Sequence, residues 1–78
     1  MTEDEVKNLI EVYKQRLLPG SLLDFVSFKG NDLELKFTCQ DKTEFLVQGK
    51  KVTMADGIRE QIEKYLKAKI SDIKVTFV

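Results

Sequence analysis

The sequence predicts an α+β fold, a two-layer sandwich in which two helices pack on one face of a small mixed sheet. Two observations lead to this prediction. Apolar residues recur three or four positions apart near the start of the chain and again after residue 53, as in amphipathic helices. Elsewhere apolar and polar residues alternate, as in half-buried strands. The expected order is helix, strand, strand, short strand, helix, strand, in a single domain over residues 1–78.

The first helix is expected to begin after Thr2. Thr2 and Glu5 have the spacing of a capping box, and the acidic residues beside them suit the positive end of the helix dipole. Pro19 and Gly20 end the helix around residues 16–18. Its apolar stripe consists of Val6, Leu9, Ile10, Tyr13 and Leu17.

A β-hairpin is predicted next, over residues 22–40. Its first strand is apolar but alternates irregularly, which indicates a bulge or partial cover of both faces. Gly30 and Asn31 both tolerate the positive φ that tight hairpin turns require. The second strand alternates without a break, and one of its faces carries Leu33, Leu35, Phe37 and Cys39.

A short third strand is predicted over residues 44–47, and residues 48–51 are interpreted as a solvated loop. Gly49, Lys50 and Lys51 do not make a phosphate-binding loop, because the fixed glycine pattern and the following Ser or Thr are missing.

The second helix is predicted to begin after Thr53, with Asp56 in its first turn. Gly57 lies inside this helix, where we expect it to allow a close approach to the sheet. A turn at residues 71–72 leads to a last strand over residues 73–78. The apolar stripe of the helix consists of Met54, Ile58, Ile62, Tyr65 and Leu66. The predicted core combines Leu9, Ile10, Tyr13, Leu33, Leu35, Phe37, Ile58, Ile62, Leu66, Ile73, Val75 and Phe77.

Composition argues against several classes of function. Thirteen basic and thirteen acidic residues give a formal net charge of +0, which argues against a nucleic-acid partner. No segment is long enough to span a bilayer and the first residues do not form a signal peptide, so we expect a cytoplasmic protein that does not enter a membrane. One cysteine and no histidine leave no internal disulfide and no protein-only zinc site, so no metal ligands are assigned.

The order of elements resembles the NifU C-terminal domain, a domain of iron–sulphur cluster assembly. The likeness rests on the Leu18-Pro19-Gly20 helix end, the hairpin over residues 23–37, the cysteine after it, the helical segment over residues 54–58 and the last strand. In that family the hairpin is followed by Cys-x-x-Cys, and two subunits pool these pairs to hold a cluster for delivery. Cys39 matches the first cysteine of the motif, whereas Lys42 stands at the second position. A dimer would therefore offer two thiolates where a cluster of the usual kind takes four.

We therefore expect a non-catalytic NifU-like domain that has lost cluster binding, takes no cofactor and acts as a small protein-interaction or assembly-accessory module. Its partner would be another protein or a second copy, bound through a free strand edge or through apolar residues of the first strand. Without histidine there is no Cys-His catalysis, and carboxylate pairs such as Glu60 and Glu63 are interpreted as solvated helix faces.

Two other functions stay open. The chain could be an iron–sulphur cluster carrier that binds its cofactor through Cys39 and external ligands such as glutathione or a client protein. It could also be a KH-like RNA-binding module, although only Gly49 of the Gly-x-x-Gly loop is present, beside two lysines. Cys39 itself either packs as a small hydrophobe or is a reactive thiol, activated by Lys42 or by the helix N-terminus near Thr53.

Overall fold

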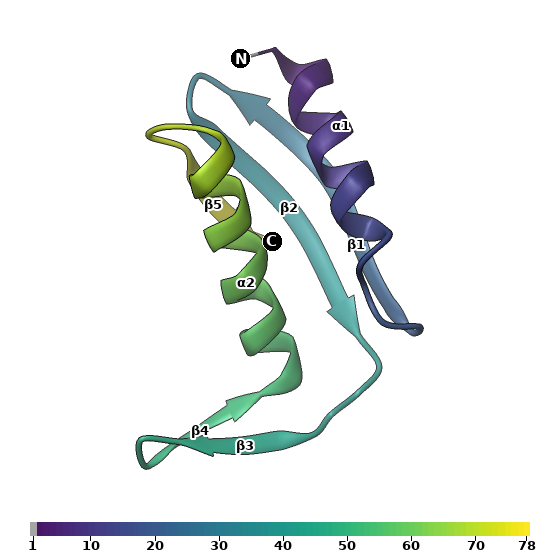
Figure 1. Cartoon of the computed structure of the whole chain (residues 1–78), viewed down its shortest axis with the longest axis vertical. Helices are drawn as coiled ribbons and strands as arrows, with labels where there is room; N and C mark the ends of the chain where they lie inside the picture. Colours follow the sequence, from purple (N-terminus) through teal and green to yellow (C-terminus); the bar gives the residue numbers. More distant parts are fainter. Residues whose placement is uncertain (1) are drawn as a thin grey trace.

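The computed structural model of the chain describes residues 2–78 and confirms the α+β class (Figure 1). β1, β2 and β5 form a mixed sheet with β2 in the middle, antiparallel to β1 and parallel to β5. β3 and β4 pair only with each other, as a separate antiparallel hairpin. The elements in chain order are α1 Glu3–Lys14, β1 Ser21–Lys29, β2 Asp32–Cys39, β3 Glu44–Val47, β4 Lys50–Thr53, α2 Met54–Lys69 and β5 Lys74–Phe77.

α1 begins with the predicted capping box. The Glu5 amide donates to the Thr2 hydroxyl at 3.2 Å, and the Thr2 amide donates to the Glu5 carboxylate at 3.0 Å. The regular helix ends at Lys14, slightly earlier than predicted. Shorter-range bonds then continue the turn, since the Leu17 amide donates to the Lys14 carbonyl at 3.1 Å. Because of these bonds, Leu17, the last residue of the apolar stripe, lies in a further helical turn beyond the end of α1.

The β1–β2 hairpin contains a bulge, one of the two alternatives that the irregular alternation of the first strand indicated. Phe25 pairs with Leu35 and Ser27 pairs with Glu34, which leaves Val26 as the extra residue on β1. In the turn, positive φ is found at Gly30, at 59°, but not at Asn31, so only one of the two expected positions has this conformation. Positive φ at the first central residue alone is the pattern of a type II′ turn.

The core lies against one face of β2, as its alternation predicted. Leu33, Leu35 and Phe37 are buried, whereas Lys36 and Thr38 on the other face are exposed. Both helices contribute to this core, with Val6 and Ile10 from α1 and Ile62 and Leu66 from α2. The buried set is Val6, Ile10, Leu23, Leu33, Leu35, Phe37, Ile62, Leu66, Ile70 and Ile73. Five predicted core residues, Leu9, Tyr13, Ile58, Val75 and Phe77, are only partly buried at its edge.

The loop predicted over residues 48–51 is wrong. Lys50 and Lys51 belong to β4, where they pair with Val47 and Leu46 of β3. The turn between the two strands consists of Gln48 and Gly49, whose φ angles are 52° and 81°. Positive φ at both central residues is the pattern of a type I′ turn, whose twist matches that of the strands it joins. The predicted third strand, β3, is confirmed, and its hairpin projects beyond the end of the main sheet (Figure 1).

No helix within residues 2–78 has the length and apolar character needed to cross a bilayer.

Candidate functional site

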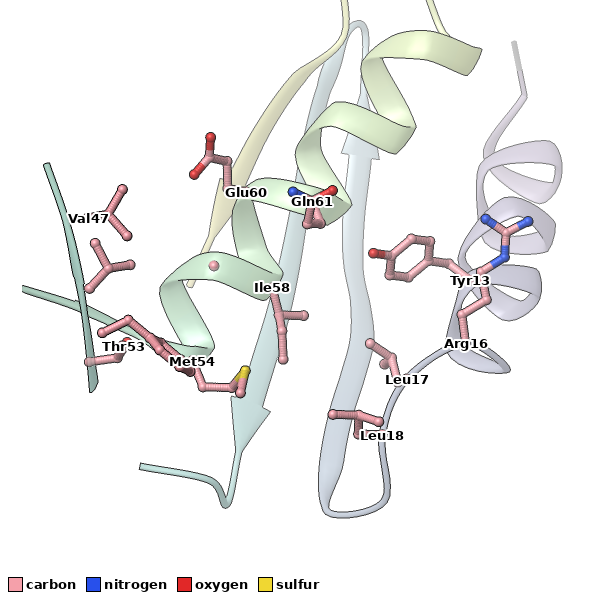
Figure 2. A pocket seen from close by; sticks show the side chains of 13 residues that line it. Tyr13, Arg16, Leu17, Leu18, Val47, Thr53, Met54, Ile58, Glu60 and Gln61 are labelled. Atoms are coloured by element: carbon pink, nitrogen blue, oxygen red, sulfur yellow. The ribbon is translucent and has the colours of Figure 1, made fainter. Parts of the chain in front are cut away.

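An apolar groove lies where the β3–β4 hairpin, the start of α2 and the segment after α1 meet (Figure 2). Its volume is about 440 Å³, which is within the usual range of binding sites in proteins. We call it the hairpin groove. It is lined by Tyr13, Arg16, Leu17, Leu18, Phe45, Val47, Val52, Thr53, Met54, Gly57, Ile58, Glu60 and Gln61.

The hairpin supplies one wall of the groove. Phe45 and Val47 alternate with Leu46 along β3, so they share one face of the hairpin, and Val52 of β4 lies opposite Phe45. Phe45 and Val47 remain 45% and 53% exposed, because no other element covers this face completely. Leu46 points to the other face and is 74% exposed. The groove wall is therefore apolar and largely open to solvent.

α2 forms the floor of the groove, and its first turn fixes the base of the hairpin. The Met54 amide donates to the Thr43 carbonyl at 2.9 Å, which ties the start of the helix to the residue before β3. Thr53 is the predicted N-cap, since its hydroxyl accepts a hydrogen bond from the Asp56 amide at 3.1 Å. Ile58 and Met54 project into the groove from this helix (Figure 2).

The segment after α1 supplies the opposite wall. The Tyr13 ring contacts the Tyr65 ring of α2, with centroids 4.9 Å apart and planes at 48°, and the Arg16 guanidinium lies 5.4 Å from the centre of the same Tyr65 ring. Burial raises the pKa of the Tyr13 hydroxyl above its ordinary value of 10.0, so the phenol is neutral at physiological pH. Leu18 completes this wall and is 60% exposed.

Two opposite charges mark the margins of the hairpin groove. Figure 2 shows Arg16 at the α1 margin and Glu60 at the margin nearer Val47. Arg16 forms no ion pair with any residue in the range 2–78. Glu60 pairs with Lys64 along α2 at 3.3 Å, but both side chains are well exposed, so this pair contributes little.

Cys39 lies at the end of β2, half-buried and in contact with the core. The Ser21 hydroxyl donates a long hydrogen bond to its sulphur at 3.8 Å. Cys39 and Lys42 line the same second pocket, of about 430 Å³, so the structure brings together the thiol and the lysine that the sequence paired. Thr53 and the α2 N-terminus line the hairpin groove and not this pocket. The core contact fits the packing role of Cys39, and the pocket that this residue lines has room for a small ligand.

Metal-binding side chains do not gather anywhere in the described part of the chain: no three His, Cys, Asp or Glu residues lie close enough to hold one ion. Cys39 is the only thiol in the sequence. A cofactor bound at Cys39 would thus need further ligands from outside one chain.

The lysines considered for RNA binding, Lys50 and Lys51, lie in β4 and not in a backbone-clamping loop. Glu60 and Glu63, considered as a carboxylate pair, each pair instead with a lysine one turn along α2, Glu63 with Lys67 at 2.8 Å. These two acidic residues therefore form part of a solvated, charge-paired helix face.

Comparison with protein families, with curated proteins and with solved structures finds no significant match. The sequence did not reveal the hairpin groove, because its residues come from three separate segments. One signal was present, however. The apolar stripes of both helices continue beyond their core residues, through Leu17 after the end of α1 and Met54 at the start of α2, and both residues line the groove.

Proposed function

We propose that the chain is a non-catalytic, NifU-like cytoplasmic domain that acts as a small protein-interaction or assembly-accessory module and docks its partner in the hairpin groove. One observation carries the proposal. β3 is exposed along its whole length, yet Phe45, Leu46 and Val47 are all large apolar residues. Exposed apolar residues gathered around a groove are typical of protein-binding surfaces.

The energetics of the hairpin support this proposal. A two-stranded hairpin is marginally stable in water by itself, and this one receives cover from α2 on part of one face. A partner that buried Phe45 fully would add an aromatic anchor of the kind that dominates binding energy at interfaces. Docking would therefore stabilise the hairpin and supply affinity through the same side chains.

A matched pair of variants tests the proposal. The immobilised chain is used to retain proteins from the source cells, and each retained protein is then purified and titrated calorimetrically against the wild type, Phe45→Asp and Leu46→Asp. We expect Phe45→Asp to weaken binding by roughly a hundredfold, as expected when an interface anchor is lost. Leu46→Asp, on the outer face of the hairpin, should change the binding affinity little. Equal affinity of wild type and Phe45→Asp for every retained protein would contradict the proposal.

Loss of cluster binding is tested separately, by anaerobic reconstitution with iron and sulphide. We expect no stable chromophore from the chain alone, because a dimer supplies two thiolates and a cluster of the usual kind takes four. A stoichiometric cluster on the protein would show that cluster binding has been retained.

A cluster carrier that uses Cys39 with external ligands is the second candidate, and the pocket lined by Cys39 and Lys42 favours it. Reconstitution with added glutathione, followed by transfer to an apo-ferredoxin, tests this function. Transfer should disappear in Cys39→Ser, a substitution that keeps the size of the side chain. Unchanged transfer in that variant would rule out a carrier role for Cys39.

A further inference from the structure

We propose that the partner in the hairpin groove is a second copy of this chain, and that two copies pack groove to groove about a two-fold axis. This inference rests on the docking function proposed above and specifies the occupant. Three observations carry it: the amount of surface that one copy leaves exposed, the place where this surface lies, and the arrangement of charge around it.

The chain exposes more surface than a monomer of its size. Its accessible surface is 5568 Å², whereas folded monomers of 9.0 kDa expose about 4,850 Å². The excess, about 700 Å², is close to the roughly 800 Å² that each partner buries in a standard interface. The radius of gyration, 13.0 Å, likewise exceeds the roughly 11.5 Å expected for a compact chain of this length. The excess exposed surface is thus of the size that a second copy would cover.

The projecting hairpin accounts for the extended shape, and its exposed apolar residues adjoin the groove. Phe45 and Val47 on one wall and Leu18 on the other all face solvent around the same opening. In a two-fold interface the same patch is used on both copies, so a single interface would cover these side chains on both. The interface would thus bury these exposed apolar side chains on both copies.

The charges at the margins match those of a second copy. Arg16 and Glu60 lie at opposite margins of the groove, as Figure 2 shows. A two-fold axis that runs along the groove, in the plane of the interface, exchanges these margins and so places Arg16 of each copy near Glu60 of the other. Arg16 has no carboxylate partner within residues 2–78, and the formal net charge of +0 leaves no overall repulsion between copies. The groove is therefore self-complementary in charge as well as in apolar character.

Charge reversal gives a decisive test, by sedimentation equilibrium of the full chain over a range of concentrations. Wild type is expected to dimerise. Arg16→Glu alone and Glu60→Arg alone should each raise the dimer dissociation constant roughly tenfold or more, because like charges then face each other twice. An equimolar mixture of the two variants should dimerise again, because both contacts in the mixed dimer join opposite charges. Lys36→Glu, on the exposed face of β2, is the control and should leave the dissociation constant unchanged.

Apolar variants locate the interface independently. Phe45→Asp should abolish the dimer, whereas Leu46→Asp on the outer face should retain it, with far-UV circular dichroism confirming that both variants are folded. A wild-type chain that stays monomeric at millimolar concentration would overturn the inference, as would a mixture of the two charge variants that does not re-associate. Loss of the dimer in Leu22→Asp, with Phe45→Asp unaffected, would instead place the interface on β1. If the chain is monomeric but still binds another protein through Phe45, this inference fails and the proposed function stands.

Discussion

Replacing Leu35 with alanine should remove a large part of the stability of the domain. The side chain is 0% exposed, and its neighbours across the sheet are Phe25 on β1 and Phe77 on β5. Leucine-to-alanine changes at buried sites cost about 2–5 kcal/mol, and two aromatic neighbours on adjacent strands leave little room for the site to collapse, so we expect about 3–5 kcal/mol. A domain of this length has a total stability of about 4–12 kcal/mol, so the loss is a substantial fraction of the whole.

Urea denaturation at one fixed protein concentration measures this loss, since dimerisation would make the midpoint depend on concentration. With a slope of about 1 kcal/mol per molar, Leu35→Ala should lower the midpoint by about 3–5 M. If this variant does not fold, Leu35→Val provides a milder change, with an expected cost of about 1 kcal/mol for the methylene removed. Lys36→Ala, on the exposed face of the same strand, should stay within about 0.5 kcal/mol of wild type. Equal midpoints for the Leu35 and Lys36 variants would refute the assignment of the two faces of β2.

Three further predictions concern the turns, the helix cap and a tyrosine. Gly20→Ala should destabilise the chain more than Gly49→Ala: φ is positive at both glycines, but an added Cβ lies 3.1 Å from the Gln40 side chain at Gly20 and meets nothing within 4 Å at Gly49. Thermal unfolding of both variants measures the difference. Thr53→Ala should cost about 1 kcal/mol in urea denaturation, because it removes the α2 N-cap, and Thr53→Ser should restore most of this loss. In a pH titration of tyrosine absorbance, Tyr13 should ionise above 10.0, because burial disfavours the phenolate. Since the folded-state pKa of this phenol is raised, its contribution to stability is present below pH 10.0 and is lost as the pH rises through the folded value, and Tyr13→Phe should remove this loss.

The sequence predicted the features that depend on neighbouring residues. The capping box at Thr2, the alternation of β2 and the bulge in β1 each follow from side chains a few positions apart, and the structure contains all three. The proximity of Cys39 and Lys42 was predictable for the same reason.

β4 was missed because its residues are polar and its turn is unusual. Two consecutive lysines, Lys50 and Lys51, are typical of a solvated loop. They are equally suited to a short exposed strand, where lysine is a common residue. The turn before them places Gln48 at positive φ, a conformation more typical of Asn, Asp or Gly. The hairpin groove was missed because its two walls and its floor come from separate segments, which only the tertiary fold brings together.

The position of the β3–β4 hairpin separates the proposed docking surface from the buried core. Residues 40–53 form an excursion within the connection that links β2 to its parallel neighbour β5, and they contribute no residue to the buried core. The entropic cost of closing a connection rises slowly, by about 0.6 kcal/mol for each doubling of its length. The hairpin could therefore be lengthened, shortened or exchanged with little cost to the scaffold. For an engineer, the hairpin is therefore a segment whose sequence can be redesigned, and the proposed docking surface altered, while the rest of the sequence is kept.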